Sequence, residues 1–474
     1  MTRTAEVGRT ATRTGIATAA SRAIGLGRVL VIAAVLGTTY LGNTFQASNS
    51  VSNVLFDLLA AGGLSAVLVP AFVGWVRDED RLERVASGVL GVATVGLGAV
   101  ALVGVVAAPS IARLLASGAP AAIAARQQEL ATFLVRWFVP QVVLYGFGAV
   151  AAAVLHAQRR FVIVAAAPIA NTVVMVVFLG AFRLHAGPNP ELSLDGMSKL
   201  LLAAAGTGGV VAFVGVLVVP VWRSGVRLLP RLRHRDAAVA PLLAHSGWGI
   251  LLNSVSGAIA GAVIVAGNAV EGGVVAFQVA FVLFLAPYAV LAQPLHSTTL
   301  PEFAADAHDS DTAGVGATAR WTLEAIVALV APVSALLVAL AGPALPALGL
   351  GLGTRGATLV GAALVGLAIG LVPYCAFLLF ARVAYACNDS RTPALVSVAG
   401  GVVGVAAIVL VRSGLHGTTL MLGLGLAHSA AFVVAMTVLG VSLRPTLGRV
   451  VTRRIVVAST TAVAVGVGAA LAGT

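Results

Sequence analysis

The dominant pattern along this chain is a series of long apolar stretches separated by short polar segments. Between Arg28 and Asp57, for example, no residue carries a charge. A helix needs about 20 apolar residues to cross the hydrocarbon core of a bilayer. The apolar runs are continuous rather than alternating, which argues against a membrane β-barrel. The pattern therefore predicts an all-α, polytopic membrane protein.

We expect about thirteen transmembrane helices from these runs. Turn residues such as Gly187-Pro188 and Asn388-Asp389 separate several of them. No polar segment between the helices is long enough to form a soluble domain. The predicted helices cover residues 14–37, 44–74, 84–108, 122–154, 160–182, 197–222, 238–267, 272–300, 313–342, 356–387, 391–412, 416–441 and 450–472.

Composition and charge agree with this pattern. Hydrophobic residues make up 59% of the chain and charged residues only 10%, against about 25% charged residues in soluble domains. The net charge is +12, and most of the 29 basic residues fall on one set of alternating loops. This bias marks the cytoplasmic side of a membrane protein. It predicts a multi-pass protein of the bacterial inner membrane with a cytoplasmic N-terminus, and it argues against nucleic-acid binding.

The chain also contains an internal repeat. The segment Leu68–Phe72 resembles Thr299–Phe303, and Tyr145 precedes a turn much as Tyr374 does, at nearly the same offset. The offset corresponds to six helices, so the two copies should share one orientation in the membrane. We therefore expect an N-terminal six-helix lobe at 1–222, a C-terminal six-helix lobe at 238–441 and an extra transmembrane helix at 450–474.

Four motifs carry a family resemblance. They are Ser21–Arg28, Gly62–Phe72 with the preceding Asn53–Phe56, Leu155–Phe161 followed by Ala167-Pro168 and Asn171, and Asn388–Pro393. In this order they resemble the signatures of the MurJ/MviN family, the lipid II flippases of the MOP exporter superfamily. The resemblance implies two six-helix lobes around a central cavity that opens by alternating access. Family members usually have fourteen helices, one more than we predict for this chain.

The resemblance implies a substrate that carries a diphosphate, and arginine side chains suit phosphate oxygens because their planar donors bind two oxygens together. Arg22 and Arg28 lie in the first predicted helix, about 9 Å apart along its axis. An arginine inside the bilayer costs at least about 2.5 kcal/mol, so its presence indicates function. We expect both to line the cavity; the alternative is that both lie at the cytoplasmic interface.

Other positions depart from the family pattern. Asn43 stands where the family usually has an acidic residue. The family also has cavity arginines near Phe56 or Asp57 and near Val282, and this chain has none at these positions. A diphosphate site with fewer cations, and with a carboxylate at Asp57, would bind its ligand more weakly.

Further polar residues could complete such a site. Asn49, Asn53 and Asp57 recur every fourth residue and would form a polar stripe on one helix face. This stripe could line the cavity or make hydrogen bonds between helices. The remaining candidates for substrate binding are Arg136, Gln141, Tyr145 and Gln278.

The sequence contains no enzyme signature, no phosphate-binding loop of an ATPase, and no histidine pair with the spacing of metal ligands. We therefore expect a transporter without a cofactor, driven by an ion gradient or the membrane potential. Three hypotheses remain: a lipid II flippase, a flippase for another lipid-linked glycan or an ion-coupled exporter, and a non-transporting scaffold. The expected partners are the lipid-linked diphosphate substrate, membrane lipids and proteins of cell-wall synthesis.

Overall fold

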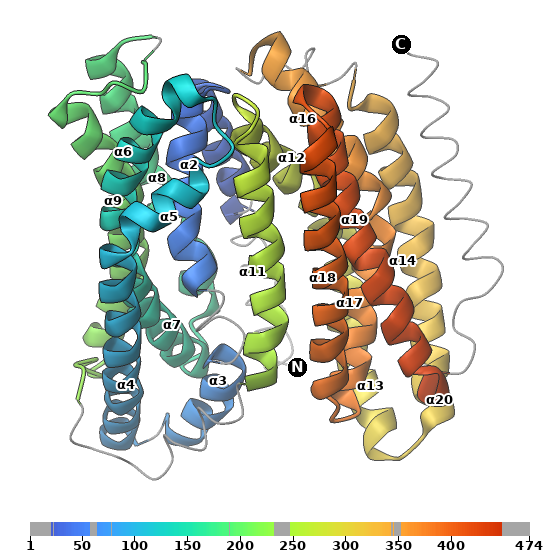
Figure 1. The fold of residues 1–474 in the computed structure, drawn as a ribbon. Helices are drawn as coiled ribbons and strands as arrows, with labels where there is room; N and C mark the ends of the chain where they lie inside the picture. Colours follow the sequence, from blue (N-terminus) through green and yellow to red (C-terminus); the bar gives the residue numbers. More distant parts are fainter. Residues whose placement is uncertain are drawn as a thin grey trace. The chain divides into compact units, whose positions relative to one another are not determined.

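The computed structural model describes residues 20–21, 23–56, 64–76, 78–188, 190–231, 247–342, 345 and 352–447, and every regular element in these ranges is a helix (Figure 1). Eight of the described helices are long and apolar enough to cross a membrane, and a ninth span is possible if one bent pair of helices counts as a single span. The predicted all-α membrane fold is confirmed. The predicted helix at 450–472 lies outside the described residues.

The chain divides into two compact units, Met1–Gly257 and Ala258–Thr474. The lobe boundaries that we expect from the sequence, 1–222 and 238–441, stay predictions. In unit 1 the first described helix is Ala23–Leu36. The helices that follow are α2 (Tyr40–Phe56), α3 (Leu64–Trp75), α4 (Glu79–Val106), α5 (Ala108–Leu115), α6 (Ala121–Phe138), α7 (Gln141–Ala157), α8 (Phe161–Ala186) and α9 (Gly196–Arg223).

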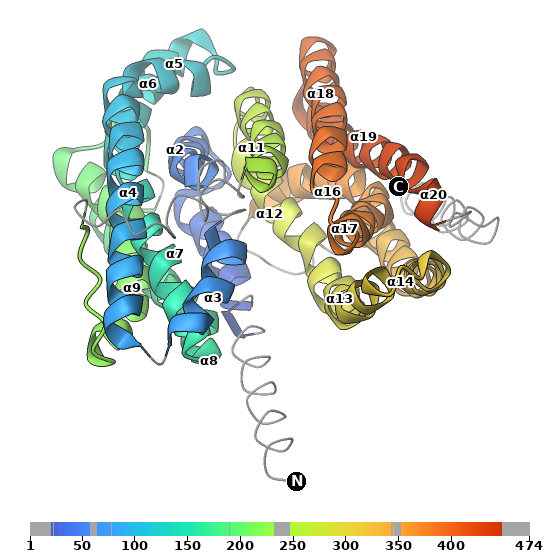
Figure 2. The ribbon, with the colours of Figure 1, turned by 90° about the horizontal axis from the view of Figure 1, so that it is seen from below.

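Helix α11 (Gly247–Gly267) contains the boundary between the units. The remaining helices belong to unit 2. They are α12 (Gly273–Pro287), the π-helical turn η2 (Tyr288–Ala292), α13 (Gln293–His308), α14 (Thr312–Leu340), α16 (Gly353–Ile369), α17 (Leu371–Ala386), α18 (Arg391–Gly414), α19 (Gly417–Ser442) and α20 (Arg444–Leu447). Seen from below, α17 lies between α13 and α18 (Figure 2).

Aspartates begin three of the long helices. Asp78 accepts a hydrogen bond from the Arg81 amide before α4, and Asp195 accepts one from the Ser198 amide before α9. Asp311 caps α14 in the same way. Such caps satisfy amides that have no partner within the helix. They define where the long helices start.

Several predicted spans are broken. The predicted span 44–74 contains two separate helices, α2 and α3, and residues 57–63 between them lie outside the described residues. The span predicted at 272–300 is interrupted by η2. The span predicted at 356–387 is bent by 47° between α16 and α17. Apolar runs predict that a segment crosses the membrane, but they do not reveal a break in its backbone.

Glycines allow two helices of unit 2 to pack backbone to backbone. A side chain at Gly425 of α19 would collide with the backbone of α16 near Ala363, and one at Gly366 of α16 would collide with the backbone of α19. Such close packing is typical of membrane helices, where small residues let dispersion contacts replace the hydrophobic effect of water. These glycines therefore join α16 and α19 closely.

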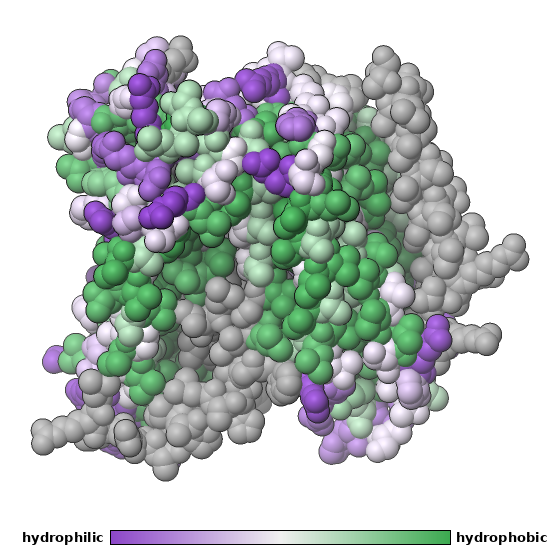
Figure 3. Space-filling model, viewed as in Figure 1, coloured by the Kyte–Doolittle hydropathy of each residue, from purple (hydrophilic) through white to green (hydrophobic). Residues whose placement is uncertain are grey.

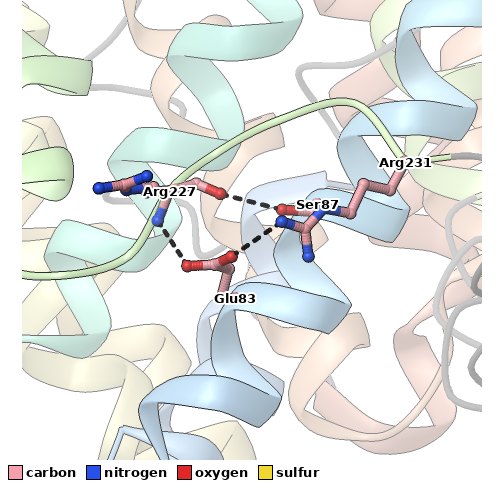
Figure 4. A network of polar contacts seen from close by, with 4 residues as sticks. All are labelled: Glu83, Ser87, Arg227 and Arg231. Carbon is pink, nitrogen blue, oxygen red and sulfur yellow. Dashed lines mark hydrogen bonds and ion pairs between the residues drawn. The ribbon is translucent and has the colours of Figure 1, made fainter.

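A short extended segment after α9, Val226–Arg231, is fixed to α4, and we call it the strap (Figure 4). Val226 is fully buried in the core of unit 1. Glu83 of α4 accepts hydrogen bonds from the Arg227 amide at 2.9 Å and from Nη2 of Arg231 at 3.2 Å. Ser87 donates its hydroxyl to the Arg227 carbonyl and accepts the Arg231 amide at its own carbonyl. The strap therefore covers α4 through both backbone and side-chain contacts.

The two units repeat one order of helices, and they end corresponding helices alike. After α7 the Arg160 amide donates to the Leu155 carbonyl, and after α17 the Asp389 amide donates to the Ala384 carbonyl, both at 2.8 Å. The residue before each donor, Arg159 or Asn388, has a φ of 60° or 59°. Two non-glycine residues in this left-handed conformation at matching positions support the internal repeat.

The surface of the long helices is apolar. On α18, Val409 and Leu410 are 64% and 74% exposed. Figure 3 shows hydrophobic residues over the middle of α18 and α19, with hydrophilic residues toward the helix ends. An exposed apolar surface of this kind fits contact with lipid tails rather than water.

Candidate functional site

Helix α2 is the polar centre of unit 1. Its sequence carries amide and hydroxyl side chains on several faces, and nearly all of them are buried within the unit. The buried polar residues of α2 are Asn43, Thr44, Gln46, Ser48, Asn49 and Ser52. Buried polar groups need hydrogen-bond partners, so a helix of this composition is unsuited to lipid contact. Helix α7, which packs against α2, supplies two such partners, Gln141 for Ser52 and Tyr145 for Asn53.

Arg28 lies in the helix Ala23–Leu36 and is partly buried. Its Nε is buried and has no hydrogen-bond partner among the described residues. The guanidinium lies within electrostatic reach of the Tyr145 hydroxyl group on α7. An arginine nitrogen that is buried without a partner is costly, and an anionic ligand would satisfy it.

Tyr145 connects this arginine to α2. Its hydroxyl donates a hydrogen bond of 2.9 Å to Oδ1 of Asn53. Its ring packs against Phe213 of α9 at a centroid distance of 6.4 Å. The structure thus brings together three of the predicted site residues, Arg28, Asn53 and Tyr145, which come from three different helices. We call these three residues the Arg28 cluster.

Gln141 belongs to a separate network. Its side chain is fully buried; Oε1 accepts a hydrogen bond from the Ser52 hydroxyl at 3.2 Å, and Nε2 donates to the Thr207 hydroxyl at 3.0 Å. Thr207 in turn donates to the Trp137 carbonyl. These contacts join α2, α7 and α9. In this conformation Gln141 therefore acts as an interhelical bridge, and its place in a substrate path stays a prediction.

The other predicted site residues are not part of the Arg28 cluster. Asn49 is 9% exposed on α2, and its carbonyl accepts the Ser52 hydroxyl. Arg136 is exposed near the end of α6, and Gln278 is partly buried on α12 in unit 2. Arg22 and Asp57 lie outside the described residues.

Sequence reasoning missed Ser52 and Thr207, which hold Gln141. Their signal was weak because a serine or threonine in an apolar helix commonly bonds to its own backbone. The predicted stripe of Asn49, Asn53 and Asp57 also covers only part of the polar surface of α2, because Asn43, Thr44, Gln46 and Ser48 are buried as well. The polar composition of 43–53 as a whole was the signal that could have identified α2 as an enclosed helix.

Among the described residues, no three histidine, cysteine, aspartate or glutamate side chains are grouped so that they could hold a metal ion. The Arg28 cluster offers a cation and neutral hydrogen-bonding groups. This chemistry suits an anion better than a metal ion.

A comparison with protein families finds one match that covers residues 32–474, the family described as "Lipid II flippase MurJ". A relative named "Probable lipid II flippase MurJ" from Rhizobium tropici is 26% identical over 304 residues, which make up 61% of this chain and 54% of the relative. The matched region thus spans about half the length of that relative.

Two solved structures share the fold. One is described as "Lipid II flippase MurJ, inward closed conformation"; it has a TM-score of 0.70 at 14% identity and covers 97% of both chains. The other is an inward-facing multidrug resistance MATE family transporter of the MOP superfamily, also with a TM-score of 0.70 at 14% identity, covering 93% of this chain and 96% of its own. At this identity, the two likenesses concern the fold alone.

Proposed function

Because this chain belongs to the lipid II flippase MurJ family, we propose that it moves lipid II, a lipid-linked diphosphate precursor of peptidoglycan, across the inner membrane. The chain is an integral membrane protein with a transporter fold. The proposed cycle is alternating access, in which the headgroup crosses through a polar path while the polyprenyl tail stays in lipid.

The observation that supports this proposal most strongly is the Arg28 cluster. The buried Nε of Arg28 lacks a partner among the described residues, although Tyr145 and Asn53 lie nearby with polar groups. A phosphate oxygen would satisfy that donor, and charge-assisted hydrogen bonds are about twice as strong as neutral ones. We assign Arg28 to diphosphate binding and Tyr145 to positioning its guanidinium. We further propose that Arg22, Asn49, Asp57, Arg136, Gln141 and Gln278 contribute to the substrate path.

The test is transport by the full-length protein in liposomes that contain fluorescent lipid II. We expect Arg28→Ala to lower the translocation rate at least tenfold, as loss of one charge-assisted contact worth about 1.5–3 kcal/mol would do. Arg28→Lys keeps the charge but not the planar donors, so it should recover part of the rate. Arg113→Gln is the control because Arg113 is exposed at the end of α5.

Two outcomes would contradict the proposal. If Arg28→Ala transports lipid II as fast as the wild-type protein, the Arg28 cluster does not bind the diphosphate. If the wild-type protein moves no lipid II while cells that lack the protein stop wall synthesis, a scaffold that recruits cell-wall proteins is favoured instead. Such a scaffold would function equally well with Arg28→Ala.

A second candidate is a flippase for another lipid-linked glycan, or an ion-coupled exporter. The fold is equally similar to that of a lipid II flippase and that of a multidrug transporter, so the fold does not distinguish the two candidates. The absence of arginine at Val282 and near Phe56 favours the second candidate, because a cavity with fewer cations suits a less charged substrate. Competition between lipid II and other undecaprenyl-linked glycans in the same liposomes separates the two candidates.

We also propose that the N-terminus lies in the cytoplasm. The excess of arginine on one set of loops supports this orientation. Labelling of single cysteines, placed at Ser117 and at Ser224 in a cysteine-free background, tests it. Both positions lie at helix ends, and a membrane-impermeant reagent should reach Ser117→Cys from outside intact cells but not Ser224→Cys. The reverse result would contradict the orientation.

A further inference from the structure

Unit 2 contains two buried histidines that the proposed function does not use. His296 on α13 is completely buried and His428 on α19 is 6% exposed. Both ring nitrogens of His296 and Nδ1 of His428 are buried without a hydrogen-bond partner in the described part of the chain. Buried polar groups in native proteins are nearly always paired, so unpaired ones require an explanation.

Aromatic rings surround His428. The centroid of its ring lies 5.6 Å from both Phe281 and Phe284 of α12, and both of these phenylalanines meet it edge to face. Phe432, one turn further along α19, lies 4.9 Å away. An aromatic ring attracts a cation that lies over its face within about 6 Å of the centroid, and the three rings come this close to His428. Burial disfavours an imidazolium at this place, so its formation requires the cluster to open.

Two tyrosines connect the histidines. Tyr374 of α17 contacts Phe284 at 5.5 Å and Phe432 at 4.8 Å. Its ring also meets Tyr288 at 5.3 Å, and Tyr288 lies 5.9 Å from His296. His296, Tyr288, Tyr374 and His428 therefore belong to one continuous aromatic cluster within unit 2.

Tyr288 is also the first residue of the π-helical turn η2 between α12 and α13. Single π-helical turns are uncommon and occur frequently at functional sites. Since Tyr288 contacts both His296 and Tyr374, a change of charge at the histidines acts directly on this turn. A switch requires an element with two arrangements, and η2 is the irregular element of unit 2 that lies beside the histidines.

Other ionisable groups do not neutralise these imidazoles. Neither histidine has an ion pair within the described residues. Within the aromatic cluster, the other ionisable side chains are those of Tyr288 and Tyr374. Helix α12 carries no ionisable residue. The other ionisable groups on α13 itself and on the packed helices α14, α16, α17, α18 and α20 are Glu302, Asp306, His308, Arg320, Glu324, Arg355, Cys375, Arg382, Tyr385, Arg391, Arg412 and Arg444.

We propose that His296 and His428 form a proton-binding site in unit 2, and that its protonation is coupled to rearrangement at η2. An unprotonated ring nitrogen takes a proton from water when the cluster opens to one side of the membrane, and the new N–H bond breaks when the proton leaves to the other side. His428 is the primary site, because its Nδ1 is buried without a partner among the described residues and three aromatic rings surround its imidazole. The coupling of this step to transport rests on the proposed function, whereas proton binding does not.

The first experiment measures protonation directly, without any lipid substrate. Solid-state NMR of the full chain, labelled with ¹⁵N-histidine in lipid vesicles, distinguishes imidazole from imidazolium. The signal that disappears in His428→Gln should convert from neutral to charged as the pH is lowered from about 8 to about 3, because burial disfavours the charged form. His296→Gln should shift that conversion, while His416→Gln, an exposed histidine at the start of α19, should not. A His428 signal that stays neutral throughout would overturn the proposal.

The second experiment measures coupling in liposomes with fluorescent lipid II and no membrane potential. If one proton crosses with each lipid II molecule, each unit of pH difference across the membrane should change the ratio of lipid II between the two leaflets by up to about tenfold. His428→Phe fills the aromatic cluster without a titratable group, so it should lose this response, whereas His416→Gln should keep it. If His428→Phe responds like the wild-type protein, coupling through this site is wrong. If the wild-type protein moves no lipid II, the proposed function fails, and the NMR titration still decides whether the proton site exists.

Discussion

Tyr145 donates its hydroxyl to Asn53 over 2.9 Å and so joins α7 to α2 beside Arg28. In unit 2, Tyr374 occupies the corresponding position on α17 and meets Phe284 of α12 ring to ring. Helices α7 and α2 of unit 1 are thus joined by a polar contact, whereas helices α17 and α12 of unit 2 are joined by an aromatic contact. The polar contact lies in the unit to which we have assigned the proposed diphosphate site, and the aromatic contact lies in the unit with the proposed proton site.

The bond between Tyr145 and Asn53 should be measurable by a double-mutant cycle. We expect Tyr145→Phe and Asn53→Ala each to lower the free energy of unfolding, and their coupling energy to be about 1 kcal/mol. Unfolding in mixed detergent micelles is the measurement. A coupling energy of zero would mean that the two side chains do not interact in the folded protein.

The strap gives a second prediction. Glu83→Gln removes the negative charge of the carboxylate that accepts hydrogen bonds from the Arg231 side chain and from the Arg227 amide. Hydrogen exchange in 226–231 should become faster. The loss in stability should be at most about 1 kcal/mol, because the Arg231 side chain is 43% exposed and solvent weakens the pair. Arg227→Ala is the matched control, since Arg227 bonds to Glu83 and Ser87 through its backbone amide and carbonyl; equal exchange in both variants would contradict this arrangement.

Gly91 of α4 gives a third prediction. A methyl group there would lie 2.6 Å from the carbonyl oxygen of Arg231, so Gly91→Ala should displace the strap and lower the free energy of unfolding by about 1–3 kcal/mol. Gly98→Ala on the same helix meets no atom within 4 Å. It should be neutral or stabilise the helix by up to about 1 kcal/mol. Thermal unfolding of both variants in detergent checks the contrast, and equal melting temperatures would refute it.

The start of α9 should respond to acid. Hydrogen bonds from Ser198 and from His185 hold the pKa of Asp195 below its ordinary value. A carboxylate with a depressed pKa stabilises the folded state above its unfolded pKa, and this stabilisation is lost as the pH falls through the folded pKa. Hydrogen exchange in the first turn of α9 should therefore stay slow at neutral pH and accelerate only in strong acid.

Asp195→Asn provides the comparison for this effect. Asparagine still caps the helix, but it carries no charge, so the first turn of α9 should be less protected than in the wild-type protein at neutral pH. The difference between the two proteins should shrink in strong acid. Identical protection at neutral pH would show that the charge of Asp195 contributes nothing.

Much of the fold could be predicted from the sequence. Apolar runs such as 197–222 and 416–441 coincide with α9 and α19, because the bilayer requires continuous apolar helices. The breaks could not be predicted. The bend at Gly370 and the π-helical turn at Tyr288 depend on packing against neighbouring helices, and hydropathy along one segment carries no information about those neighbours.

The candidate site was predictable to a smaller extent. Arg28, Asn53 and Tyr145 were identified as unusual residues for apolar helices, and the structure places them together. Gln141 was equally unusual, yet it bridges helices through Ser52 and Thr207. A polar side chain in a membrane helix signals a partner, and only three-dimensional contacts reveal whether that partner is another helix or a ligand. The histidine cluster could not be predicted because its members come from three segments that are distant in sequence, around 281–296, 374 and 428–432.

The matching turns at Arg159 and Asn388 show what the two units have in common at this place. Both residues adopt a left-handed backbone that glycine would adopt more readily, and they share no side-chain chemistry. The two units therefore have in common the backbone geometry of this turn and not the side chain that it carries.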